Sequence, residues 1–164
     1  MAGDGPTLEL AIGTGRIALP LAARGVRVDG IDISPAMIAK LRDKAGGDQI
    51  SVTIGDFAEV PAPGSYRLVY VVFNTLFNLL SQEEQVRCFE NVAAHLTDDG
   101  SFVVEAFVPT YLTRLRDPVT QRLSESHVRL TGEGVRLYPI VTRYAWPAEL
   151  DLMARIAGLR LKDR

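Results

Sequence analysis

A glycine turn near the start of the chain has the residue types needed to hold a nucleotide-like ligand. Gly13 and Gly15 flank Thr14, between an apolar run at 7–12 and a helical run that extends to about residue 24. Because neither glycine has a Cβ, a ligand or a second backbone can approach the turn closely. The free N–H groups of the helix point toward the turn, which suits a ligand with negative charge or lone pairs.

A carboxylate follows this turn at an informative distance. Asp32 lies 19 residues after Gly13, at the end of a second apolar run, 26–33. A carboxylate at the tip of a strand can accept hydrogen bonds from both hydroxyls of a ribose. The alternative is a tight strand–helix turn with a solvated aspartate. The spacing favours the nucleotide-like ligand.

Further candidate residues end the next two apolar runs. Asp56 and Phe57 follow the run 50–54, where Asp56 could accept from an adenine amino group and Phe57 could lie against the ring. The alternative is an Asp-capped turn with Phe57 in the core. Asn74 ends the strongly apolar run 66–73, and it could bind a ligand or cap the next segment. All of these positions belong to the strand ends at which open α/β sheets bind ligands.

The elements that position these residues alternate between strands and helices. Beyond the runs already named, Ser34-Pro35 starts a helix, Ser81 and Glu84 form a capping box for another, and 101–107 reads as a fifth strand after a turn at 98–100. This order predicts an α/β fold, a doubly wound and mostly parallel Rossmann-like sheet with helices on both faces.

The pattern changes after residue 107. The polar stretch 109–125 reads as a short helix plus loop, and 127–130 and 135–144 flank a glycine turn, which predicts a small antiparallel hairpin insertion at about 109–144. A last helix and the start of one more strand follow at 146–164. We therefore expect a single domain over 1–164 with its core at 7–107.

The composition narrows the function classes. The net charge of -2 leaves no basic excess for a nucleic-acid backbone, so we expect no nucleic-acid partner. No apolar run reaches membrane-spanning length and no signal pattern opens the chain, so we expect no membrane partner. Cys88 is the only cysteine, which excludes an intrachain disulfide and fits a cytoplasmic protein. We predict no metal site.

Three motifs together carry a family resemblance. Residues 9–15 (ELAIGTG) match the E-x-G-x-G-T-G motif of class I S-adenosylmethionine-dependent methyltransferases, with Ala11 in place of the first glycine. Residues 30–34 (GIDIS) and 55–57 (GDF) match the second-strand and third-strand motifs, and Phe73-Asn74 takes the position of the fourth. The sequence resembles this family, in its small-molecule methyltransferase-domain type, over roughly 7–107 and more loosely over 143–161.

The resemblance implies S-adenosylmethionine as cofactor, with S-adenosylhomocysteine as product. The glycine turn would pass against the methionine moiety and Arg16 could pair with its carboxylate. Asp32 would bind the ribose, Ile33 and Met37 would pack on adenine, and Asp56 and Phe57 would flank the base. The implied cofactor-binding residues are Glu9, Ala11, Gly13, Gly15, Arg16, Asp32, Ile33, Met37, Asp56, Phe57, Phe73 and Asn74.

The implied activity is transfer of a methyl group to an O or N atom of a small-molecule acceptor. An in-line displacement at a sulfonium needs positioning and desolvation more than an acid or base, so the catalytic residue stays unknown. If a base is needed, the candidates are His127, Tyr111 and Glu105. The hairpin insertion is our prediction for the substrate side, and the alternative is that it forms the surface of a homodimer.

The chain departs from the family at its ends. Such enzymes usually carry helices before the first strand that cover the cofactor, and here about six residues precede it. They usually finish with an antiparallel strand pair, and here the chain ends inside the first of those strands. We therefore expect a domain that lacks the N-terminal lid and the C-terminal strand, either a trimmed fragment or a sheet edge completed by another chain.

Two other functions compete with this interpretation. An NAD(P)-dependent dehydrogenase is suggested because Gly13, Gly15 and Ala18 fit the dinucleotide fingerprint. The carboxylate of Glu9 inside the first strand and the missing second mononucleotide half count against it. The other alternative is a non-catalytic, methyltransferase-like module that binds the cofactor or a partner without turnover.

Overall fold

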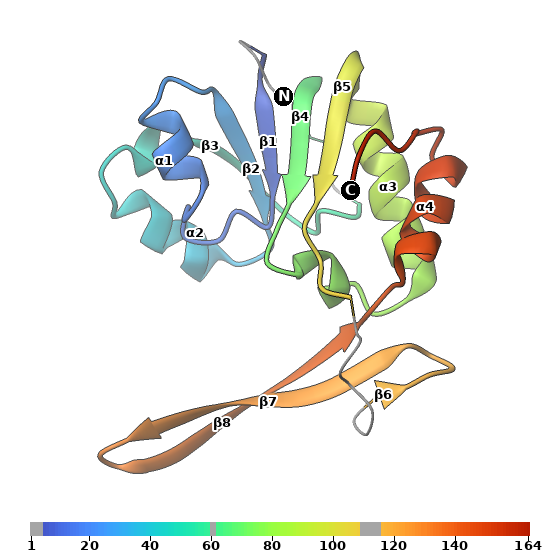
Figure 1. The fold of residues 1–164 in the computed structure, drawn as a ribbon. Helices are drawn as coiled ribbons and strands as arrows, with labels where there is room; N and C mark the ends of the chain where they lie inside the picture. Colours follow the sequence, from blue (N-terminus) through green and yellow to red (C-terminus); the bar gives the residue numbers. More distant parts are fainter. Residues whose placement is uncertain (1–4, 60–61, 109–115) are drawn as a thin grey trace.

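A five-stranded parallel sheet forms the centre of the domain (Figure 1). The computed structural model describes residues 5–59, 62–108 and 116–164. The spatial order is β3-β2-β1-β4-β5, and every neighbouring pair is parallel. This confirms the predicted doubly wound sheet. The strands are β1 (Thr7–Leu10), β2 (Val28–Asp32), β3 (Ser51–Ile54), β4 (Tyr66–Val71) and β5 (Leu96–Val104).

Helices begin where the sequence provides caps. The Ser34 hydroxyl accepts from the backbone N–H of Met37, and Ser81 and Glu84 form the predicted capping box. The first helix starts late, so Pro20 falls in its first turn, where a missing N–H costs little. The helices are α1 (Ala18–Ala22), α2 (Pro35–Arg42), α3 (Gln82–His95) and α4 (Pro147–Ile156), with short 3₁₀ turns η1 (Gly47–Gln49) and η2 (Thr75–Asn78).

Two apolar clusters pack the helices on opposite faces of the sheet. The larger cluster joins Leu8, Leu10 and Val69 to Phe89 of α3 and Met153 of α4. The smaller cluster joins residues of α1 and α2 to the sheet through Ile12, Ala18, Val28, Leu41 and Ile50. Because side chains alternate along a strand, Glu9 projects from the face opposite to Leu8 and Leu10.

A second, antiparallel sheet follows the fifth strand. It contains β6 (Arg116–Asp117), β7 (Arg122–Thr131) and β8 (Gly134–Arg143), in the order β6-β7-β8. The predicted hairpin is confirmed, and Figure 1 shows it beyond the carboxyl ends of the parallel strands. The prediction of a short helix plus loop was wrong at 116–117 and 122–125, where strand pairing overrides the polar local composition, whereas 118–121 do form a turn. Residues 109–115, including the candidate base Tyr111, lie outside the described residues.

Two further predictions differ from the structure. The expected turn at 98–100 lies within β5, because Tyr66 pairs with Leu96 while Leu68 pairs with Ser101. This register shift is a bulge that absorbs the extra residues. Residues 159–164, where we predicted the start of a strand, form no strand; Lys162 instead donates a hydrogen bond to Ser101 Oγ at 2.8 Å.

Candidate functional site

A pocket opens at the point where the strand order reverses, between β1 and β4. This is the topological switch point at which doubly wound sheets bind ligands. The cavity has a volume of about 470 Å³, which lies within the usual range for small-molecule sites. Ten of the predicted cofactor residues line it: Glu9, Ala11, Gly13, Arg16, Asp32, Ile33, Met37, Asp56, Phe57 and Phe73.

The Asp32 carboxylate joins the two loops that form one side of the pocket. Its Oδ2 accepts from the backbone N–H of Gly13 at 2.6 Å, and its Oδ1 accepts from the N–H of Ser34 at 2.8 Å. An ionised carboxylate has about four lone-pair sites, so each oxygen can accept one further hydrogen bond. Asp32 can therefore hold the turn and receive ligand hydroxyls at the same time.

The two glycines of the turn have different surroundings. Both have positive φ, +56° at Gly13 and +74° at Gly15. A Cβ on Gly13 would meet nothing closer than Met37 Cε at 3.9 Å, whereas a Cβ on Gly15 would lie 2.3 Å from Leu41 Cδ1. Gly15 is not among the lining residues. Its missing Cβ serves the packing of the turn against α2, and the missing Cβ of Gly13 leaves room in the pocket.

Glu9 provides a buried carboxyl group in the pocket. Its side chain is paired across β1 and β4 with Tyr70, whose hydroxyl donates to Glu9 Oε2 at 2.8 Å. Burial raises the pKa of Glu9 from 4.5 to about 7, against the opposing effect of the Tyr70 hydrogen bond. Burial and the neighbouring Glu9 likewise raise the pKa of Tyr70 far above its usual value. The pair is therefore neutral over much of the acidic range.

Exposed apolar side chains and one cation line the outer part of the pocket. Ile33 is 69% exposed, Phe73 49% and Met37 41%. The Arg16 guanidinium lies 4.1 Å from the centroid of the Phe73 ring, a cation–π contact. Large exposed apolar side chains gathered around a pocket are typical of a ligand-binding surface.

Asp56 and Phe57 have the structural roles weighed from the sequence and also lie at the pocket. Asp56 Oδ1 accepts from the backbone N–H of Ala58 at 2.9 Å, so it caps a turn. Phe57 is 8% exposed and belongs to the larger apolar cluster. Both residues also line the pocket. Their structural roles therefore do not remove them from the candidate site.

Asn74 and Glu105 instead tie the ends of β4 and β5 together. Asn74 Oδ1 accepts from the backbone N–H of Phe107 at 2.7 Å, and Glu105 Oε2 accepts from the N–H of Phe73 at 3.0 Å. Neither residue is among those that line the pocket. Asn74 is at the N-cap position of η2, with a positive φ of +62° that asparagine tolerates well, but its side chain makes no capping hydrogen bond there. Its amide oxygen holds the segment after β5 instead, a role not weighed from the sequence.

The other described candidate base lies on the hairpin and is not among the residues that line the pocket. His127 is exposed on β7, opposite Tyr138 of β8. Over 5–59, 62–108 and 116–164, no group of three His, Cys, Asp or Glu side chains is placed to hold a metal ion. In the same ranges no helix combines the length and apolar character needed to cross a membrane.

Sequence reasoning missed the residues that η2 adds to the pocket. The pocket is also lined by Val72, Thr75, Asn78 and Leu79, because η2 directly follows the carboxyl end of β4. Their position directly after a buried parallel strand was the available signal. The remaining lining residues that were not predicted are Ile12, Thr14 and Ser34.

The comparison with known families defines the class of protein. Residues 7–100 match the family model described as "Methyltransferase domain". The chain therefore belongs to the methyltransferase domain family, and the resemblance to class I S-adenosylmethionine-dependent methyltransferases is confirmed. The strand order and the pocket at the switch point agree with that assignment.

Individual relatives agree with the family. The CcbJ methyltransferase from Streptomyces caelestis is 38% identical, with a TM-score of 0.89 over 99% of this chain and 75% of that one. An uncharacterized methyltransferase of Bacillus velezensis is 36% identical over 96 residues, which is 58% of this chain and 44% of the relative. The chain thus spans less than half the length of such curated relatives.

A more distant structure shows the same fold. CalS10, an amino pentose methyltransferase from Micromonospora echinaspora involved in calicheamicin biosynthesis, was solved with S-adenosylmethionine bound. It is 21% identical, with a TM-score of 0.73 over 95% of this chain and 75% of that one. At that identity the likeness concerns the fold alone.

Proposed function

We propose that this chain binds S-adenosylmethionine and belongs to an enzyme that transfers the methyl group to an O or N atom of a small molecule. The observation that carries the proposal is the bond of 2.6 Å between the Gly13 N–H and Asp32, inside a pocket of about 470 Å³ at the switch point of the sheet. Membership of the methyltransferase family supports the reaction type.

The residues of the pocket fit the chemistry of this cofactor. The free lone pairs of Asp32 can accept from ribose hydroxyls, and the space above Gly13 admits a chain that passes close to the backbone. Exposed Ile33 and Met37 offer apolar contact to a flat ring. Arg16, whose guanidinium lies over the Phe73 ring at the pocket, can pair with a carboxylate.

The role of the protein in such a reaction is positioning. When bound, S-adenosylmethionine would supply an electrophilic methyl group carried on a sulfonium. The protein must align acceptor and donor and exclude water. For acceptors that must lose a proton, we propose His127, on the hairpin at the carboxyl-end side of the sheet, as the base. Glu105, the other described candidate, accepts a hydrogen bond from the Phe73 N–H, and we therefore do not propose it as the base.

The hairpin is our proposal for the acceptor side, and its opposite face is our proposal for a homodimer contact. Register places Glu125, His127 and Arg129 on one face with Arg136 and Tyr138. The other face carries five exposed aliphatic residues. Val128 pairs with Leu137, Leu130 pairs with Val135, and Val141 lies opposite Ser124. A polar face suits a small polar acceptor, and an apolar face suits a second copy of the hairpin.

The single buried Cys88 supports a reducing, cytoplasmic setting.

Calorimetric titration with S-adenosylhomocysteine tests the proposal. The unsubstituted chain should bind it saturably, Asp32→Ala should lose binding, and Asp48→Ala, an exposed aspartate outside the pocket, should bind like the parent. A parallel titration with NAD covers the dehydrogenase alternative. Binding of NAD but not of S-adenosylhomocysteine by the folded chain would contradict the proposal.

A further inference from the structure

A buried polar cluster lies where the hairpin joins the rest of the domain. Arg143, the last residue of β8, is 5% exposed, and its guanidinium donates to three separate segments. Nη1 donates to Gln85 Oε1 of α3 at 2.6 Å. Nη2 donates to Glu149 Oε1 of α4 at 2.6 Å and to Gln121 Oε1, before β7, at 2.8 Å. One side chain thus connects both ends of the hairpin with two helices.

Gln85 connects the same cluster to the pocket. It is fully buried, and its amide nitrogen donates to the carbonyl of Arg143 at 2.8 Å and to the carbonyl of Leu79 at 3.1 Å. Leu79 lines the candidate cofactor pocket. The neighbouring Leu80 carbonyl accepts from Arg122 Nη2 of β7 at 3.3 Å. The segment at one end of the pocket and the base of the hairpin therefore share hydrogen-bond partners.

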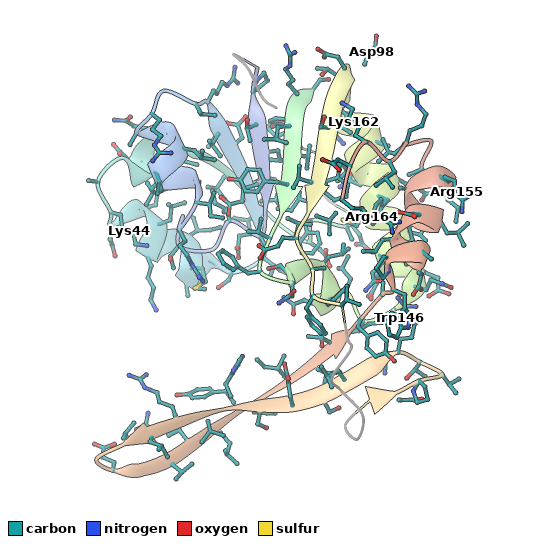
Figure 2. All side chains as sticks on the ribbon, viewed as in Figure 1. Lys44, Asp98, Trp146, Arg155, Lys162 and Arg164 are labelled. Carbon is teal, nitrogen blue, oxygen red and sulfur yellow. The ribbon has the colours of Figure 1, made fainter. Side chains whose placement is uncertain are left out.

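Among the described residues, those that fix the direction of the hairpin are concentrated at its base. None of the residues 124–141 is buried, whereas Leu123, Thr142 and Arg143 at the base are. Figure 2 shows the hairpin side chains projecting into solvent and places Trp146 at the junction with α4. A two-stranded ribbon without a second layer gains little rigidity from its own contacts. The base must therefore determine where the ribbon points.

We infer that Arg143 and Gln85 are positioning residues that hold the hairpin in one orientation over the pocket end of the sheet and thereby place the acceptor. The inference rests on the proposed function, since it takes the hairpin as the acceptor side. Tilting the ribbon would draw Arg143 from at least one acceptor and leave a buried charge or amide unpaired, which is strongly unfavourable. The planar guanidinium also fixes the directions of its donors, which a lysine ammonium does not.

The test measures the orientation of the hairpin directly. Nitroxide labels are attached at Glu133→Cys in the hairpin turn and at Asp48→Cys in η1, both exposed positions, and the distance distribution is measured by pulsed electron resonance. Cys88 is buried, and labelling of the chain without added cysteines checks that it does not react. The perturbing variant is Gln85→Leu with Arg143→Met, which removes both members of the Gln85–Arg143 pair together, so neither is left buried without the other. Glu149 keeps donors in that variant, from Gln82 at 2.9 Å and Gln121 at 2.7 Å.

The parent should give one narrow distance peak, and the double variant should lose it to a broad distribution. Arg87→Met, which removes the surface ion pair with Glu59 at 3.2 Å, should keep the narrow peak. Far-UV circular dichroism and cooperative unfolding confirm that each variant is folded. An unchanged narrow peak in the folded double variant, or a broad distribution already in the parent, overturns the inference. Because the distance needs neither cofactor nor turnover, failure of S-adenosylhomocysteine binding would count against the proposed function alone.

Discussion

Glu9 and Tyr70 face each other across two parallel strands, and the Tyr70 hydroxyl donates to Glu9 Oε2 at 2.8 Å. The pair lies beside the pocket, where Glu9 is only 4% exposed. A carboxyl group in this setting favours its neutral form, because burial penalises the charge more than one hydroxyl compensates for it. The stability of the domain should therefore depend on pH through this residue.

The first prediction concerns that pH dependence. Burial raises the pKa of Glu9 in the folded state from 4.5 to about 7, so the folded chain keeps a proton that the unfolded chain releases between these values. The contribution of Glu9 is most favourable below about pH 4.5 and is lost as the pH rises through about 7, with a total effect of about 3 kcal/mol. In Glu9→Gln, urea unfolding at about pH 5 and about pH 8 should show a smaller fall in the free energy of unfolding than in the parent. An equal fall in both proteins would contradict the assignment.

The second prediction concerns the hydrogen bond that Glu9 accepts from the Tyr70 hydroxyl. Tyr70→Phe removes the donor and leaves the buried carboxyl with one hydrogen bond fewer, so the free energy of unfolding should drop by about 1–3 kcal/mol. The loss should be larger at high pH, where Glu9 is charged, than at low pH. Tyr66→Phe is the matched control, since the Tyr66 hydroxyl donates to Asp29 instead of Glu9. The loss of stability in this control should not follow the ionisation of Glu9. A loss that is independent of pH in Tyr70→Phe would count against the pairing with an ionisable Glu9.

The third prediction separates the two glycines of the turn. Gly15→Ala puts a Cβ 2.3 Å from Leu41 Cδ1 at a positive φ, so we expect a loss of stability of about 2–4 kcal/mol in urea unfolding. Gly13→Ala has room for the Cβ and should cost only the backbone strain of about 1–2 kcal/mol. Gly13→Ala should nevertheless weaken S-adenosylhomocysteine binding, because its methyl group projects toward the pocket. Equal stability losses in the two variants would contradict the close packing of Gly15 against Leu41.

The fourth prediction concerns the apolar face of the hairpin. Leu130→Ser with Leu137→Ser removes two exposed leucines, of which Leu130 is 77% exposed and Leu137 63%. If this face joins two copies of the chain, sedimentation velocity should show a dimer for the parent and a monomer for the variant. Ser124→Ala, on the same face of β7 near the base, is the control and should leave the parent state unchanged. A parent that is monomeric at high protein concentration would refute the dimer.

Local pattern was enough to predict the order of strands and helices in the core. Alternating apolar runs, the Ser34-Pro35 start and the Ser81–Glu84 capping box act within a few residues of the chain, and the structure has these elements where they were expected. The glycine turn and Asp32 were predicted to belong together, and a bond of 2.6 Å joins them. Parallel strands place their carboxyl ends at one edge of the sheet, so the sequence alone could assign these residues to one site.

Contacts between distant segments decided the rest. Asn74 was expected to bind a ligand or to cap the next segment, and the approach of Phe107, after β5, gives its side chain a different partner. The hairpin was predicted at 127–130 and 135–144, but its extension over 122–126 depends on pairing with β8, which the polar composition of that segment does not indicate. The cluster of Arg143, Gln85 and Glu149 joins residues up to 64 positions apart in the printed sequence.

The sequence by itself determined the fold class, the motif positions and the type of ligand they suit, because these depend on residue type and short-range spacing. The tertiary structure alone decided which of those residues line the pocket and which serve packing, as Gly15 does against Leu41. It also decided how Arg143 holds the hairpin. The physical reason is that burial and hydrogen-bond partners depend on long-range contacts, so they are set only when the chain has packed.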